Sequence, residues 1–125
     1  MLYVLSGCAS YAERNPEKIV RQRVAERWDA LIEGRLESAY SFETPEYREI
    51  YSFPEYRMTI HGVGAWRKVE IDDVECVDDK CVASIVIYAN ITLGKGFGAV
   101  DSNAPAKESW VRDSISEQWF HVSEH

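Results

Sequence analysis

The spacing of apolar residues divides the chain into two halves that differ in period. Between Asn15 and Gly34 the apolar residues recur every three or four positions, which places them on one stripe of an amphipathic helix. The members of this stripe are Val20, Val24, Trp28, Leu31 and Ile32. The charged residues between them, Arg27 included, are expected to face away from the core. Asn15 can cap the first turn, Pro16 fits there without losing a hydrogen bond, and Gly34 can end the helix.

Three shorter segments extend the helical half. Residues 36–42 carry apolar side chains that can pack inward. Thr44-Pro45-Glu46 repeats the order of a cap, a proline and an acid, and predicts a further helix that runs to Tyr51. Residues 52–56 look like one more helical turn. The chain before His61 is therefore expected to be helical.

From His61-Gly62-Val63-Gly64 onward the period changes to two, which is typical of strands. Residues 66–76 form the first expected strand, and their apolar positions slip by one at Asp72-Asp73, which indicates a β-bulge. The odd positions from Cys81 to Leu93 are all apolar and predict the longest strand. A glycine-rich loop and a polar stretch follow. Residues 107–112 and 117–122 then complete an antiparallel sheet of about four strands.

Helices followed by such a sheet predict an α+β fold, with the N-terminal helices packed in the concave face of a curved, roughly four-stranded antiparallel sheet. Residues 27–40, RWDALIEGRLESAY, and residues 44–48, TPEYR, are similar to the helical half of bacterial nuclear transport factor 2-like proteins. Trp110 and Trp119-Phe120 resemble the closing hairpin of that fold. The resemblance spans residues 15–122 and implies a cone-shaped domain. Because this family includes isomerases, dehydratases, ligand carriers, secretion-system subunits and lipoproteins, it implies no single activity.

The first residues resemble the signal that directs bacterial lipoproteins. Leu5-Ser6-Gly7-Cys8 is similar to a lipobox, in which the chain is cleaved before the cysteine and the cysteine is lipidated. The resemblance implies that residues 1–7 are the remnant of a signal peptide, that Cys8 carries lipid, and that residues 8–14 form a tether to one domain at residues 15–125. It further implies a periplasm-facing protein of the bacterial envelope, held to the membrane by its lipid anchor only. The alternative is a short apolar N-terminus of a cytosolic protein with an incidental cysteine.

The other two cysteines, Cys76 and Cys81, flank a polar turn between two strand-like segments. If they face each other across a hairpin, their side chains lie within reach of a disulfide. Such a bond persists outside the cytosol and is rare inside it. Zinc is the alternative ligand for a cysteine pair, but no second pair of cysteines or histidines follows at a suitable spacing. We expect a disulfide here, and neither a metal nor a cofactor.

Composition narrows the functional classes. The chain has 125 residues and a net charge of -7, with 46% hydrophobic residues, as a single packed domain requires. A deficit of lysine and arginine argues against nucleic acid, whose phosphates need a basic surface. No apolar run is long enough to span a bilayer.

Four residues are expected to line a cavity inside the cone: Tyr40, Tyr47, Tyr56 and His61. No residue is assigned as catalytic, because none lies in a motif of an enzymatic branch. The sequence therefore predicts a non-enzymatic envelope lipoprotein that binds a protein partner or small ligand. One alternative is a small isomerase or dehydratase that uses an Asp/Tyr/His set in the cone. Another is an interaction subunit that forms a homodimer through the sheet face at Val82, Val86 and Tyr88. Phe97, in the glycine-rich loop, is a candidate contact for a partner.

Overall fold

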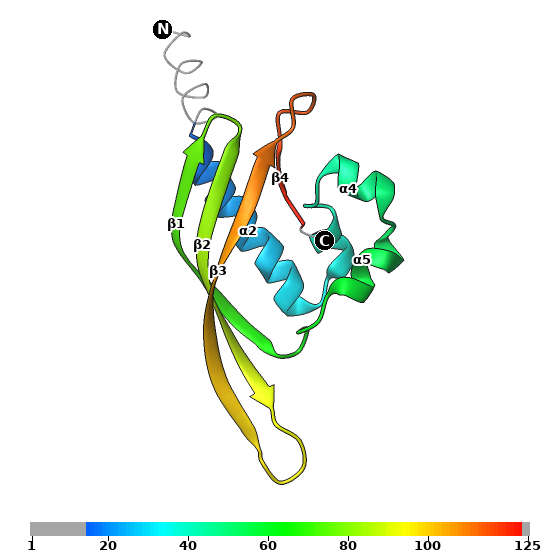
Figure 1. Cartoon of the computed structure of the whole chain (residues 1–125), viewed down its shortest axis with the longest axis vertical. Helices are drawn as coiled ribbons and strands as arrows, with labels where there is room; N and C mark the ends of the chain where they lie inside the picture. Colours follow the sequence, from blue (N-terminus) through cyan, green and yellow to red (C-terminus); the bar gives the residue numbers. More distant parts are fainter. Residues whose placement is uncertain (1–14, 124–125) are drawn as a thin grey trace, which may run out of the picture.

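The computed structural model describes residues 15–123 and confirms the expected α+β fold (Figure 1). The helices are α2 (Pro16–Glu33), α3 (Leu36–Tyr40), α4 (Pro45–Ile50) and α5 (Phe53–Thr59). The strands are β1 (Trp66–Val77), β2 (Lys80–Thr92), β3 (Ala99–Arg112) and β4 (Trp119–His121), and they form one antiparallel sheet in the order β1-β2-β3-β4. The expected signal-peptide remnant, Cys8 and the tether lie outside the described residues. No helix within residues 15–123 is both long and apolar enough to cross a membrane.

The ends of α2 follow from its sequence. The Asn15 side chain accepts a hydrogen bond from the Lys18 amide at 3.2 Å, and Pro16 occupies the first turn. Gly34 adopts a left-handed conformation with φ 77°, which lets the amide of Arg35 reach the Ala30 carbonyl at 2.8 Å. This is the Schellman end that a glycine favours. The long helix therefore starts and stops where the sequence predicts.

The short helices are capped in the same manner. The Thr44 hydroxyl accepts from the Tyr47 amide at 3.1 Å at the start of α4. Ser52 and Glu55 form a reciprocal capping box at the start of α5. These helices lie on the same side of the sheet as α2 (Figure 1), so the helices of residues 15–123 cover one face of the sheet.

The sheet has the register that the sequence predicts for its first two strands. Ile71 pairs with Ile85 and Asp73 with Ser84, so Asp72 is the extra residue of a β-bulge. Cys76 pairs with Cys81, and their sulfur atoms form a disulfide with the Cα atoms 4.0 Å apart. The predicted bridge is confirmed, and closing so short a loop contributes about 2 kcal/mol in the chain-entropy model.

The third strand begins earlier than the sequence predicts. We expected a strand over residues 107–112, whereas β3 starts at Ala99 and includes Pro105. Proline is tolerated because its missing N–H is on the side away from β2. In a strand, residues an even number of positions apart direct their backbone groups to the same side. Ser109, four residues after Pro105, has its carbonyl on the side away from β2, where the carbonyl accepts a hydrogen bond from the Val122 amide at 2.9 Å.

The last strand is shorter than expected. Residues 117–122 were predicted as strand, but β4 covers only Trp119–His121, because Glu117 has φ 63° and belongs to the preceding turn.

Arg23 holds this short strand against α2. Its guanidinium donates two hydrogen bonds to the Trp119 carbonyl, at 3.1 and 2.8 Å, and lies 4.4 Å from the ring centre of Phe42.

Candidate functional site

Four ionisable side chains from four separate segments meet in the core between α2 and the sheet. They are Arg27 of α2, Glu43 of the loop after α3, Glu108 of β3 and His121 of β4. Arg27 is 6% exposed and Glu43 is fully buried. Charges this deep are costly unless they are paired and hydrogen-bonded. We call this set the buried network.

Arg27 stands between the two carboxylates. Its Nη1 donates to Glu108 Oε2 at 2.9 Å, and its Nε lies 3.5 Å from Glu43 Oε2. Glu108 also accepts from two indoles, Trp28 Nε1 at 2.8 Å and Trp110 Nε1 at 3.3 Å. Both oxygens of Glu108 are thus engaged inside the protein.

Glu43 binds the C-terminal segment to the helical layer. It contacts His121 Nδ1 at 3.0 Å and accepts a hydrogen bond from the Ser123 hydroxyl. The His121 amide in turn donates to the Phe42 carbonyl at 2.7 Å. Burial raises the pKa of the Glu43 carboxyl, but the hydrogen bonds and charges of His121, Arg27 and Ser123 outweigh burial, so its pKa is lowered overall.

The lowered pKa of Glu43 predicts a loss of stability in acid. A carboxyl whose folded pKa lies below its unfolded value, about 4.5, stabilises the fold fully above that value. The contribution is lost as the pH falls through the folded pKa. Glu43→Gln is therefore expected to be less stable than wild type at neutral pH, with a smaller difference in acid. Urea unfolding at several values between about pH 6 and about pH 3 measures this, and a difference that stays constant over this range contradicts it.

Tyr56, expected to line a cavity, is instead packed in the core. It is 1% exposed, and its hydroxyl has no hydrogen-bond partner among the described residues. Burial raises its pKa to about 12, with the positive charge of Arg27 acting against the rise. The rings of Tyr40 and Tyr47 lie 5.2 and 6.2 Å from the Tyr56 ring.

The other expected cavity residues occupy different places. The Tyr40 hydroxyl donates to the backbone carbonyls of Arg48 and Tyr51, which holds α4 against α3. Tyr47 is mostly buried and borders a surface hollow beside α4. His61 is exposed in the connection after α5. The three tyrosines therefore gather in one aromatic cluster, and His61 does not join them.

Sequence reasoning missed the buried network, although part of its signal was present. Arg27 was expected to face solvent, and this expectation is wrong. It lies three residues after Val24 and four before Leu31, on the same stripe as both. Glu108 has the same parity as the buried Trp110, which indicates the same face of β3. Glu43 and His121 gave no such signal, because only the fold brings them together.

A pocket of about 320 Å³ opens beside the buried network. We call it the α2–β3 pocket. Its lining includes Trp28, Ile87, Ala106, Glu108, His121 and Ser123. One wall is apolar and the other polar, which is the usual character of a binding site. The carboxylate oxygens of Glu108 are occupied, whereas His121 keeps one ring nitrogen without a hydrogen bond to residues 15–123, and Lys107 also borders the pocket.

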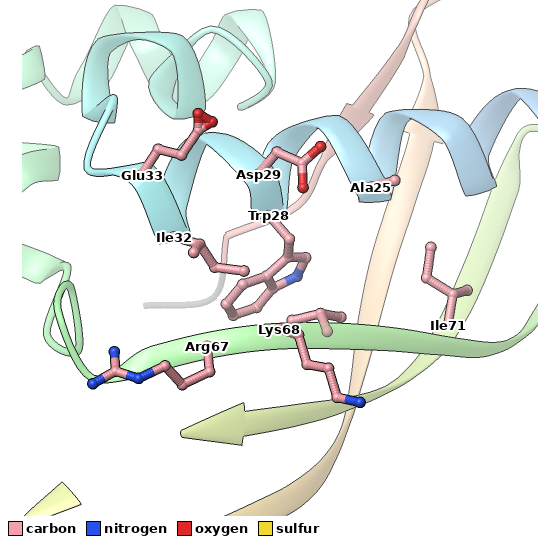
Figure 2. A pocket seen from close by; sticks show the side chains of 9 residues that line it. Ala25, Trp28, Asp29, Ile32, Glu33, Arg67, Lys68 and Ile71 are labelled. Atoms are coloured by element: carbon pink, nitrogen blue, oxygen red, sulfur yellow. The ribbon is translucent and has the colours of Figure 1, made fainter. Parts of the chain in front are cut away.

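A second, smaller pocket of about 220 Å³ lies between α2 and β1. Figure 2 shows Trp28 and Ile32 pointing into it from the helix, whereas Asp29, Glu33, Arg67 and Lys68 lie at its rim. The Trp28 ring packs edge-on against Trp66, 5.1 Å away. Polar groups do not converge inside this pocket, so it is a packing gap and not the better candidate.

Within residues 15–123 no group of three or more His, Cys, Asp or Glu side chains is arranged to hold a metal ion. Comparison with known proteins adds no relative: no protein-family model matches the chain, and no curated protein matches it. The candidate site is therefore the α2–β3 pocket and the buried network behind it.

Proposed function

We propose that this protein is a lipid-anchored member of the nuclear transport factor 2-like lipoproteins in the bacterial envelope, and that its domain binds a partner and catalyses no reaction. One observation carries the second part. The space between helices and sheet is filled by side chains such as Trp110, Tyr56 and Leu31, each at most 1% exposed. No substrate can enter that space, and within residues 15–123 the buried network meets a pocket only at Glu108 and His121, which line the α2–β3 pocket.

The chemistry of the network supports the same proposal. A catalytic acid or base needs a free proton site that the substrate can reach. The carboxylates of Glu43 and Glu108 are instead bound by Arg27, His121, Ser123 and two indoles. They hold the segments of the domain together. What remains accessible is the α2–β3 pocket and the sheet surface next to it, which suit binding.

Two features support the envelope location. One is the likeness of Leu5-Ser6-Gly7-Cys8 to a lipobox. The other is the Cys76–Cys81 disulfide, a bond that is rare in the cytosol. Two acyl chains on Cys8 would hold the protein stably at the membrane surface.

Palmitate labelling tests the anchor. The full gene, including any coding sequence upstream of Met1, is expressed in a bacterial host that is fed labelled palmitate. We expect label in the wild-type protein and none in Cys8→Ala. The matched control is Cys76→Ala/Cys81→Ala, which retains Cys8 and should be labelled. A wild-type protein without label would overturn the lipoprotein proposal.

A proton-transfer enzyme is the second candidate, and one contact favours it. Glu43 orients the imidazole of His121 through Nδ1, and His121 lines the α2–β3 pocket. A carboxylate–histidine pair at a pocket is a common general base. Turnover of a small substrate that is lost in His121→Gln, with the free energy of unfolding unchanged, would favour this candidate over binding.

A further inference from the structure

The apolar face of the sheet continues beyond the helices that cover it. Along β2 the odd positions are buried up to Ile85, but Ile91 is 42% and Leu93 is 50% exposed. Figure 1 shows why: the β2–β3 hairpin extends past the end of the helical layer. We call residues 87–106 the arm. Its face on the helix side, the arm face, consists of Ile87, Ala89, Ile91, Leu93, Val100, Ser102, Ala104 and Ala106.

The arm face carries no charge on a strongly acidic chain. The arm has two charged residues, Lys95 in the loop and Asp101, which accepts from Asn90 Nδ2 at 2.8 Å on the opposite face. Its own net charge is therefore zero, whereas the whole chain has a net charge of -7. In soluble domains the solvent-exposed face of an antiparallel sheet is normally polar. An uncharged apolar face of this kind matches a partner surface that is also apolar and uncharged.

The edge of the arm is protected, in contrast to its face. The odd residues of β3 direct their backbone groups to the outer edge, as the bond from the Val122 amide to Ser109 shows. Pro105 stands at such an odd position and has no N–H to offer. A further strand could not pair continuously across it. Docking by strand addition along β3 is therefore disfavoured, and β1 already pairs with β2 as far as Ala89, so docking on the face is favoured.

The arm has an exposed aromatic ring at its tip and a pocket at its base. At the tip, Phe97 is 76% exposed, in a loop whose glycines Gly94, Gly96 and Gly98 all have positive φ. At the base, Ile87 and Ala106 form the apolar wall of the α2–β3 pocket together with Trp28. The pocket, about 320 Å³, is large enough for an aromatic ring.

We propose that the arm binds a second copy of this chain, with the two arm faces packed antiparallel about a two-fold axis and each Phe97 inserted into the α2–β3 pocket of the partner copy. The proposal deepens the proposed function, because it names the partner. Antiparallel alignment of two equal arms brings the tip of one to the base of the other. It also places the two acidic bodies at opposite ends, where their repulsion is weakest.

The size of the surface sets the expected affinity. Eight face residues and Phe97 on each copy, at about 40 Å² per residue, bury on the order of 700 Å² in total, which is typical of a weak complex. We expect a dissociation constant in the micromolar range or weaker. Lipid anchoring would raise the effective concentration of both copies and favour the dimer.

Sedimentation equilibrium of the unlipidated chain tests the proposal, with Cys8→Ser in every variant to prevent cross-links through that cysteine. We expect a reversible monomer–dimer equilibrium for a subunit of 14.3 kDa. Ile91→Lys and Phe97→Asp should each raise the dissociation constant tenfold or more. Val82→Lys is the matched control, since Val82 is 41% exposed but lies on the opposite face. A monomer up to millimolar concentration overturns the proposal, as does a dimer that only Val82→Lys breaks.

Cysteine cross-linking tests the antiparallel arrangement. Lys95→Cys, which keeps Phe97, combined with Ala106→Cys should yield a covalent dimer on oxidation, because tip and base meet between copies. Lys95→Cys alone should remain monomeric on a denaturing gel. A covalent dimer from Lys95→Cys alone indicates tip-to-tip packing and overturns the insertion into the pocket. Palmitate labelling is independent of these results, so failure of the dimer and failure of the lipid anchor are distinguishable.

Discussion

Arg27→Ala is expected to lower the free energy of unfolding by about 3–5 kcal/mol, as removal of one partner from a buried ion pair does. The guanidinium is the positive charge that contacts both Glu43 and Glu108 in the core. Its removal leaves two carboxylates in a medium of low dielectric constant, where one must take up a proton or draw in water. Urea unfolding at neutral pH, followed by far-ultraviolet circular dichroism, measures the change.

Two comparisons isolate the cause. Arg35→Ala removes an arginine whose partner, Glu33, is 3.2 Å away at the surface, and should cost about 0–1 kcal/mol. Arg27→Met/Glu43→Gln/Glu108→Gln removes the charges together and should recover much of the loss, since an uncharged set of similar volume is often as stable as a buried ion pair. An Arg27→Ala protein within about 1 kcal/mol of wild type would mean that the buried network is not formed as described.

The buried network explains why the two halves of the chain fold as one unit. Arg27 comes from the first helix, Glu43 from the helical layer, and Glu108 and His121 from the last strands. Three of the contacts, Arg27–Glu108, Trp28–Glu108 and Glu43–His121, join residues that are 78 to 81 positions apart in the sequence. Such contacts form only when the sheet has closed over the helices. The hydrogen bonds of these side chains therefore serve to join the segments of the domain.

Local features of the fold could be predicted from the sequence because their causes are local. Asn15, Pro16 and Gly34 determine the ends of α2 through hydrogen bonds made within a few residues. The bulge at Asp72 follows from a slip in an alternating pattern. The disulfide follows from a short turn between two strands. In each case the sequence signal and the structural cause occupy the same segment.

Features that depend on distant segments could not be predicted. Residues 99–106 have few strand-forming side chains and contain Pro105, and they form a strand only because β2 supplies the partner backbone. Tyr56 was expected to line a cavity because of its residue type, but its place in the filled core depends on Tyr40, Tyr47 and Arg27 around it. Glu43 has no neighbour in sequence that reveals its partner His121.

Trp110→Ala is the second substitution with a large expected effect, a loss of about 3–5 kcal/mol in the free energy of unfolding. The Trp110 side chain is fully buried, with ring centres 6.4 Å from Phe42 and 5.7 Å from His121. Truncation leaves a cavity of indole size, and it removes the hydrogen bond that the indole donates to Glu108. Both losses act at the junction of β3, β4 and the helical layer.

Trp110→Phe separates these two losses, because it keeps most of the ring and removes only the donor. Glu108 retains its bonds from Arg27 and Trp28, so we expect a cost of about 1–2 kcal/mol, near that of one hydrogen bond and a small cavity. Ile115→Ala is the control for loss of apolar volume, since Ile115 is 92% exposed and its truncation should change the free energy of unfolding by no more than about 0.5 kcal/mol. Urea unfolding of the three variants gives the order. If Trp110→Ala were no more costly than Ile115→Ala, the aromatic filling of the space between the helices and the sheet would be wrong, and a substrate could then enter the space that this side chain occupies.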